Sequence, residues 1–158
     1  MNTDDTDGAA VRIPPPLVYL GAVLVGVLLH AFVLPAPFVI ALPVRIGLAL
    51  VVALPGLWLA AGAIGLFRRT GQDPKPWKST PEIVSVGVYS RTRNPMYLGM
   101  ACVQVSIGVG LGNGWIVALA VPVLATIYLT AIRHEERYLE RKFGDAYLAY
   151  KASVRRWI

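Results

Sequence analysis

The sequence predicts an all-α integral membrane protein with about four transmembrane helices and a cytoplasmic C-terminal amphipathic helix. Two observations lead to this fold class. The 158 residues are 56% hydrophobic and only 15% charged, whereas a soluble domain carries roughly a quarter charged residues. The charges are also segregated, because Arg45 is the only one between Leu17 and Phe67, and residues 94–132 carry none. Each of these two blocks has room for two spans of about 20 apolar residues.

Residues 17–158 are expected to form a single membrane domain, preceded by a disordered tail at 1–16. The tail has three aspartates against one arginine, and it lacks the basic start and the small-residue cleavage site of a signal peptide. The first apolar block predicts spans at about 17–34 and 44–67. Between them, the prolines of 35–43 indicate a short turn, because proline disrupts helices.

The second apolar block is interrupted once, by Gly-Asn-Gly at 112–114. Glycine and asparagine are residues that tight turns favour, so we expect a hairpin of two spans, at about 95–111 and 115–132. The charged, amphipathic segment 133–143 predicts a continuing helix, and Gly144 indicates a break after it.

The Lys and Arg residues between the spans predict which side of the membrane each connection occupies. The central loop at 68–94 has six and the tail from Arg133 has seven, whereas the turns at 35–43 and 112–114 have none. Because positive charge marks the cytoplasmic side, we expect a multi-pass protein of the inner (plasma) membrane with both termini cytoplasmic. The net charge of +6 is then explained by cytoplasmic loops that face anionic lipid headgroups. No nucleic-acid partner is expected. The single cysteine, Cys102, lies in an apolar run, so no metal site is expected.

Asn94 and Pro95 open the third predicted span, and they permit two interpretations. Asparagine is a favoured N-cap and proline fits the first helical position, so one interpretation is helix initiation, with Tyr97 in the interfacial belt. The other is ligand binding, since a helix N-terminus presents free N–H groups and partial positive charge to a carboxylate or phosphate. Composition does not choose between them.

Glu135 follows Tyr128 at helical spacing and falls in the apolar stripe that the fourth span uses for packing. A carboxylate that faces the protein interior beside a membrane needs a partner. The two alternatives are an ion pair with Arg91 or Arg93 of the central loop, and a ligand with a hydroxyl or cationic group. Glu136, one position round the helix, is expected to be a solvated or interfacial charge.

Two segments flank the predicted hairpin: GVYSRTRNPMYLG at 87–99 and EERYLERKFGDAYLAYKASVRRW at 135–157. They are similar to the patterns G-x-Y-x-x-x-R-H-P-x-Y and E-E-x-x-L-x-x-x-F-G-x-x-Y-x-x-Y, in that order. These patterns belong to the membrane methyltransferases related to isoprenylcysteine carboxyl methyltransferase and the phospholipid N-methyltransferases. The chain resembles this family over about residues 68–158.

The resemblance implies a methyltransferase that binds S-adenosylmethionine at the cytoplasmic membrane face and acts on a lipophilic small molecule or lipid that enters from the membrane. Matched residue by residue, the family pattern implies eight cofactor-binding positions: Ile83, Val84, Tyr89, Asn94, Pro95, Met96, Tyr97 and Glu135. The acceptor, the oligomeric state and the catalytic residue stay unassigned.

The chain departs from the family pattern at two positions. Asn94 stands where the family has histidine, and Ala131 stands where the isoprenylcysteine enzymes place an arginine one turn before the glutamate. An isoprenylcysteine acceptor is therefore not expected. Two other functions stay open: an NADPH-dependent membrane reductase of the sterol-reductase type, with Arg91 and Arg93 near the 2′-phosphate, and a non-catalytic membrane module.

Overall fold

The computed structural model describes residues 8, 9, 11, 13–71, 73, 75 and 77–158. Over these residues the structure is helical and contains no β-strand. Three helices are long and apolar enough to cross a membrane: α1 (Pro15–Phe32), α2 (Leu42–Arg69) and a continuous helix at Gly114–Phe143. The shorter α3 (Pro95–Leu111) is the fourth apolar helix. The predicted all-α membrane fold is confirmed.

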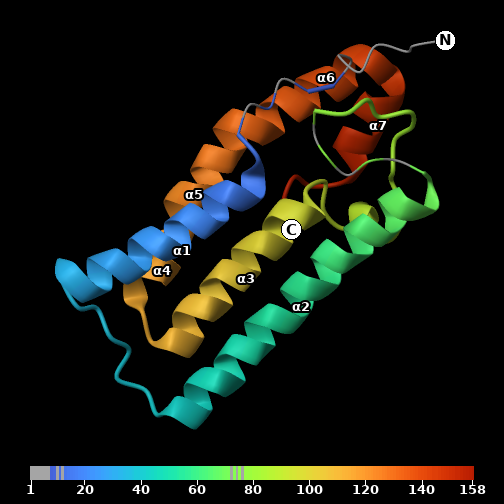
Figure 1. The fold of residues 1–158 in the computed structure, drawn as a ribbon. Coiled ribbons are helices and arrows are strands. Elements are labelled where there is room, and N and C mark those ends of the chain that lie inside the picture. The colour runs from blue at the N-terminus through green and yellow to red at the C-terminus, as the bar shows by residue number, and fades with distance from the viewer. Residues whose placement is uncertain (1–7, 10, 12, 72, 74, 76) are drawn as a thin grey trace.

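Figure 1 shows these four helices as long rods that lie side by side. The last rod is not uniform. It consists of α4 (Gly114–Ala118), α5 (Ala120–Ile127), the π-helical turn η2 (Tyr128–Ile132) and α6 (Arg133–Phe143). After Gly144, α7 (Asp145–Ser153) turns back from α6, at the position where the sequence indicated a break.

The turn at 112–114 closes the hairpin between α3 and α4. Gly112 adopts a left-handed conformation with φ +67°, which costs glycine little. The Asn113 side chain caps α4 by accepting hydrogen bonds from the backbone N–H groups of Trp115 at 3.0 Å and Ile116 at 3.2 Å. Its amide group also donates to the Gly26 carbonyl of α1 at 3.1 Å. One asparagine therefore fixes the hairpin and attaches it to the first helix.

Small residues set the distance between α2 and α3. A Cβ atom placed on Gly99 would lie 2.6 Å from the Gly56 carbonyl oxygen and 3.0 Å from the Ala60 Cβ. Membrane helices pack closely where such residues meet, because their backbones can then approach each other. This contact holds the first turns of α3 against the middle of α2.

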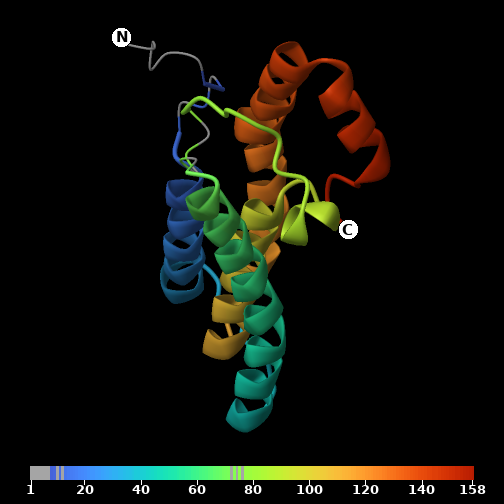
Figure 2. The same ribbon diagram turned by 90° about the vertical axis from the view of Figure 1, so that its right-hand side faces the viewer.

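Figures 1 and 2 place the central loop, α6 and α7 at one end of the bundle, and the connections at 33–41 and 112–114 at the other. The central loop contains a short 3₁₀ helix, η1 (Gly87–Ser90). The basic residues of the central loop and those of the C-terminal tail therefore gather at the same end of the bundle. This is the end where the sequence predicted the candidate site.

The predicted disordered tail at 1–16 falls partly outside the described residues, because 1–7, 10 and 12 are not among them. Two described residues in this segment, Ala9 and Val11, are buried and belong to the same apolar cluster as Tyr19 of α1. The chain just before α1 thus packs against the protein.

Candidate functional site

A cavity lies between the central loop, the start of α3, α6 and α7. Protein atoms leave about 790 Å³ free there, its open mouth included. Seven of the eight positions predicted to bind a cofactor line it: Ile83, Val84, Tyr89, Asn94, Met96, Tyr97 and Glu135. The eighth, Pro95, is buried in the first turn of α3 and does not line the cavity.

Glu135 meets Tyr97 inside this cavity. The Tyr97 hydroxyl donates a hydrogen bond to the Glu135 carboxylate, and the Tyr97 carbonyl accepts one from the Tyr19 hydroxyl of α1 at 2.8 Å. The alternative of an ion pair between Glu135 and Arg91 or Arg93 is therefore wrong. The partner within the described part of the chain is a neutral phenol, so no cation there neutralises the carboxylate.

Glu136 was expected to be a solvated or interfacial charge, but it is not solvated, and it is the carboxylate that pairs with arginine. It is 8% exposed. Its Oε1 accepts hydrogen bonds from Arg93 at 3.1 Å and Arg156 at 3.0 Å, and its Oε2 accepts a second one from Arg156 at 3.0 Å. The C-terminal segment folds back over this side of α6, so Glu136 is covered by protein.

Asn94 occupies the N-cap position of α3, as the helix-initiation interpretation expects, but its side chain makes no capping hydrogen bond. Its amide group instead donates to the carbonyl oxygen of Arg156 at 3.1 Å. The same oxygen accepts a hydrogen bond from the Thr92 hydroxyl at 3.0 Å, and the backbone of Arg93 donates to the Arg155 carbonyl at 3.0 Å. The C-terminal tail and the start of α3 are thus held together.

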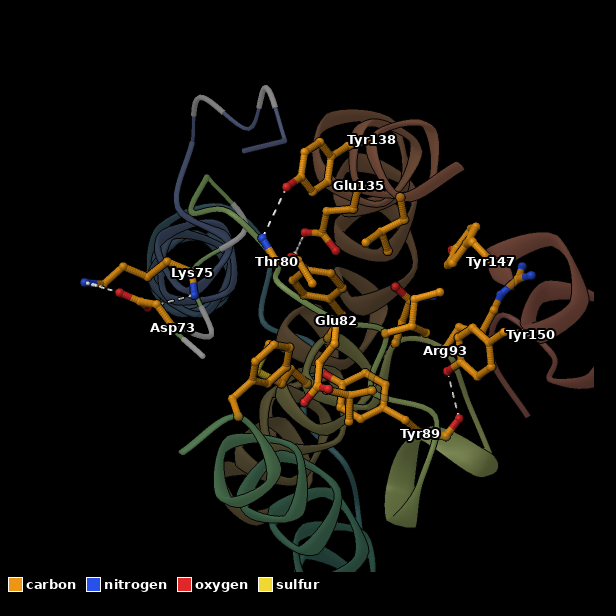
Figure 3. A pocket seen from close by; sticks show the side chains of 17 residues that line it. Asp73, Lys75, Thr80, Glu82, Tyr89, Arg93, Glu135, Tyr138, Tyr147 and Tyr150 are labelled. Atoms are coloured by element: carbon orange, nitrogen blue, oxygen red, sulfur yellow. Dashed lines mark hydrogen bonds and ion pairs between the residues drawn. The ribbon is translucent and has the colours of Figure 1, made fainter. Parts of the chain in front are cut away.

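Aromatic side chains form another wall of the cavity, as Figure 3 shows for Tyr89, Tyr147 and Tyr150. The Phe67 and Tyr89 rings meet edge to face at 5.8 Å, and the Tyr150 hydroxyl donates to the Tyr89 carbonyl at 2.8 Å. Burial raises the pKa of the Tyr89 and Tyr147 hydroxyls above the usual range, and that of Tyr150 to about 12. These phenols stay neutral at physiological pH and offer apolar faces with polar tips.

Arg93 lines the cavity, and one of its donors has no partner among the described residues. Its side chain is 7% exposed, and its Nη1 donates to the Lys151 carbonyl at 3.0 Å. Its Nε is buried and has no hydrogen-bond partner among the described residues. Buried donors nearly always find an acceptor, so an unpaired N–H on a residue that lines the cavity is unusual.

The central loop is attached over the cavity by Tyr138 and Lys142 of α6. The Tyr138 hydroxyl accepts hydrogen bonds from the Thr80 backbone N–H at 3.2 Å and from the Lys142 ammonium at 2.8 Å. The ammonium also donates to the Ser79 hydroxyl at 2.7 Å. α6 therefore holds the loop segment that continues to Ile83.

Sequence reasoning missed several cavity residues. From the sequence, Arg93 is a candidate partner only of Glu135 or of a 2′-phosphate, and Tyr147 and Tyr150 have no assigned role. A signal for them is present, because all three lie at fixed positions of the two family-like segments. Thr80, by contrast, lies outside these segments, and nothing in the sequence points to it.

A second cavity, which is apolar, adjoins the first. It lies between the start of α1, α2 and the start of α3, and protein atoms leave about 830 Å³ free there. Its lining includes Ala60 and Ile64 of α2, Met96, Tyr97 and Met100 of α3, Trp77 of the central loop and the prolines at 14–16. Met96 and Tyr97 line both cavities, so they form the wall between a polar space and an apolar one.

Comparisons with known proteins relate most of this helical region to one family. The family model for phospholipid methyltransferases matches residues 43–146, which run from α2 to the start of α7. A Haemophilus influenzae protein, described only as uncharacterized, is 38% identical over 63 residues. The aligned part is 40% of this chain and the whole of that protein. No solved structure matches.

Proposed function

The chain belongs to the phospholipid methyltransferase family, and on this premise we propose that it transfers a methyl group from S-adenosylmethionine to a lipophilic small molecule or lipid at the cytoplasmic membrane face. The family match covers about two thirds of the chain. The observation that carries the proposal is the shared wall of Met96 and Tyr97 between a polar, aromatic cavity and an apolar one. A water-soluble donor and a membrane-soluble acceptor require such a pair of neighbouring sites.

The residues of the polar cavity fit S-adenosylmethionine. The guanidinium group of Arg93, which lines the cavity, is suited to the carboxylate of the cofactor. Glu135 is suited to its ammonium group or ribose hydroxyls, and the faces of Tyr89 and Tyr147 to its adenine. When bound, the cofactor supplies a methyl group activated by a positive sulfonium. The chain's own task is then to position the reactants and exclude water.

The apolar cavity is suited to the acceptor. Apart from Lys75, its lining has no charged side chain among the described residues, so the part of the acceptor that it holds is hydrocarbon. Ala131, where the isoprenylcysteine enzymes place an arginine, is fully buried at 0% exposure. This position offers neither a cation for an acceptor carboxylate nor room for one. We therefore propose an acceptor with an amine, a hydroxyl or another small nucleophile.

Calorimetric and thermal-shift titrations of the detergent-purified protein test the proposal. We expect S-adenosylmethionine and S-adenosylhomocysteine to bind and to raise the midpoint of unfolding, and NADPH to do neither. A ligand at a hundredfold excess over its Kd stabilises the folded state by about 2.7 kcal/mol, which is readily measured. Stabilisation by NADPH alone would favour the reductase alternative, and no response to any of the three would favour the non-catalytic module.

A further inference from the structure

A third cavity lies outside the candidate site, between the face of α2 that runs from Trp58 to Arg69 and the short helix η1. Protein atoms leave about 920 Å³ free in it, its open side included. None of the residues that line it lines either of the other two cavities. This groove is therefore a separate feature with its own chemistry.

The floor of the groove is a track of small residues on α2. Ala61, Gly62 and Gly65 line it, with Trp58 at one end and Arg69 at the other. A Cβ atom on Gly65 would meet no other atom within 4 Å, so the space above it is open. The eleven steps from Trp58 to Arg69 span about 16 Å along a helix. This length is close to half of the roughly 30 Å hydrocarbon core, which is the depth of one leaflet.

Two arginines also line the groove. Arg69 is in the last turn of α2 and Arg91 directly follows η1. Both are exposed, and neither pairs with a carboxylate among the described residues. Guanidinium groups bind phosphate with two parallel hydrogen bonds, which makes them well suited to a lipid headgroup.

We propose that this groove binds one anionic phospholipid from the leaflet on the side of the candidate site. The phosphate lies on Arg69 and Arg91, and an acyl chain lies along the track from Gly65 toward Trp58. The charge of the two arginines selects an anionic headgroup, and the length of the track matches a chain that enters the same leaflet. This inference is independent of the proposed methyl transfer.

The lipid would support a wall of the candidate site from behind. Val88 of η1 packs closely on α2, since a Cβ atom on Gly62 would lie 2.8 Å from the Val88 Cγ1. The next residue, Tyr89, faces the candidate site. A lipid in the groove therefore adds packing to the outer side of η1.

Native mass spectrometry of the detergent-purified protein tests this site. The protein is mixed with equal amounts of phosphatidylglycerol and phosphatidylcholine that have the same acyl chains. We expect preferential retention of one phosphatidylglycerol molecule, and a loss of that preference of roughly tenfold in the Arg69→Gln/Arg91→Gln variant. The control, Arg137→Gln/Arg141→Gln, removes the same charge from exposed positions of α6 and should retain the preference.

A second pair of variants tests the acyl track. Gly65→Leu fills the groove and should lower retention of both lipids, whereas Gly47→Leu should not. Gly47 is the matched control, because it is also on α2 and a Cβ there also meets nothing within 4 Å.

Three outcomes would overturn the proposal. The first is unchanged retention of phosphatidylglycerol in both the Arg69→Gln/Arg91→Gln variant and the Gly65→Leu variant. The second is an equal loss in the Arg137→Gln/Arg141→Gln control, which would indicate general surface charge. The third is displacement of phosphatidylglycerol by inorganic phosphate at the same concentration, which would indicate a simple anion site without an acyl track.

Discussion

The Tyr97 hydroxyl donates a hydrogen bond to the Glu135 carboxylate and so joins the first turn of α3 to the first turn of α6. Tyr97 is 4% exposed and lines both the polar and the apolar cavity. A carboxylate has two oxygen atoms with several acceptor sites, and this hydrogen bond uses only one of them. Glu135 therefore retains capacity for a ligand at the junction of the two cavities.

We expect Glu135→Gln to weaken binding of S-adenosylmethionine, because the variant loses a charge-assisted hydrogen bond to the ligand. Such a bond contributes about 1.5–3 kcal/mol, which corresponds to roughly a tenfold to hundredfold increase in Kd. Isothermal titration calorimetry measures it. Glu140→Gln is the control, since Glu140 is also on α6 but pairs with Lys151 and does not line the cavity. Equal effects of the two substitutions would contradict the assignment of Glu135.

Glu136→Gln is expected to act on stability instead. It leaves Arg93 and Arg156 without their carboxylate, and breaking a buried ion pair from one side costs about 3–5 kcal/mol. Because the Arg156 side chain is 33% exposed and solvent screens its charge, we expect the loss of stability to lie at the lower end of this range. Thermal unfolding in detergent measures it, with Asp145→Asn on the exposed start of α7 as the control. If the losses of stability caused by Glu136→Gln and Arg156→Gln were additive in a double-mutant cycle, the two side chains would not stabilise each other.

Gly99→Ala should destabilise the bundle. The added Cβ would lie 2.6 Å from the Gly56 carbonyl oxygen, a backbone atom that cannot move without shifting α2. Forcing atoms into a close-packed contact costs roughly 1–3 kcal/mol. Gly47→Ala is the matched control, because a Cβ at Gly47 meets nothing within 4 Å. Equal unfolding midpoints for the two variants would show that α2 and α3 pack less closely than described.

A prenylcysteine should be a poor acceptor compared with a lipid amine or hydroxyl. The buried Ala131 provides no cation for its carboxylate, and an uncompensated charge in an apolar site is costly. Transfer of a labelled methyl group to a farnesylcysteine analogue and to phosphatidylethanolamine, in parallel, measures the preference. Efficient methylation of the farnesylcysteine analogue would mean that another group, such as Arg93, binds the carboxylate.

The two ends of the bundle should lie on opposite sides of the membrane. Val39, in the connection between α1 and α2, is 99% exposed, and Arg141 of α6 is exposed at the other end. In a Cys102→Ala background, a membrane-impermeant maleimide added to intact cells should label Val39→Cys but not Arg141→Cys. The reverse pattern would place the candidate site outside the cell.

The sequence by itself determined the fold class and seven of the residues that line the candidate site. Segregated charges predicted the four apolar helices, because the energetic cost of charge in a bilayer is large enough to be visible in composition. The turn at 112–114 was predicted from local chemistry, since glycine and asparagine favour such turns in any context. The two family-like segments and the loop before them supplied seven residues that line one cavity.

Only the tertiary structure decided which partner each polar residue has. A helical stripe assumes a regular helix, but the π-helical turn at Tyr128–Ile132 takes up an extra residue and rotates the residues after it by about 100°. The partners of Glu136 and Asn94 come from the C-terminal tail, which no local pattern places beside them. Burial and pairing depend on such distant contacts, so Glu136 could be identified as a buried ion-pair residue only once the fold had brought Arg93 and Arg156 to it.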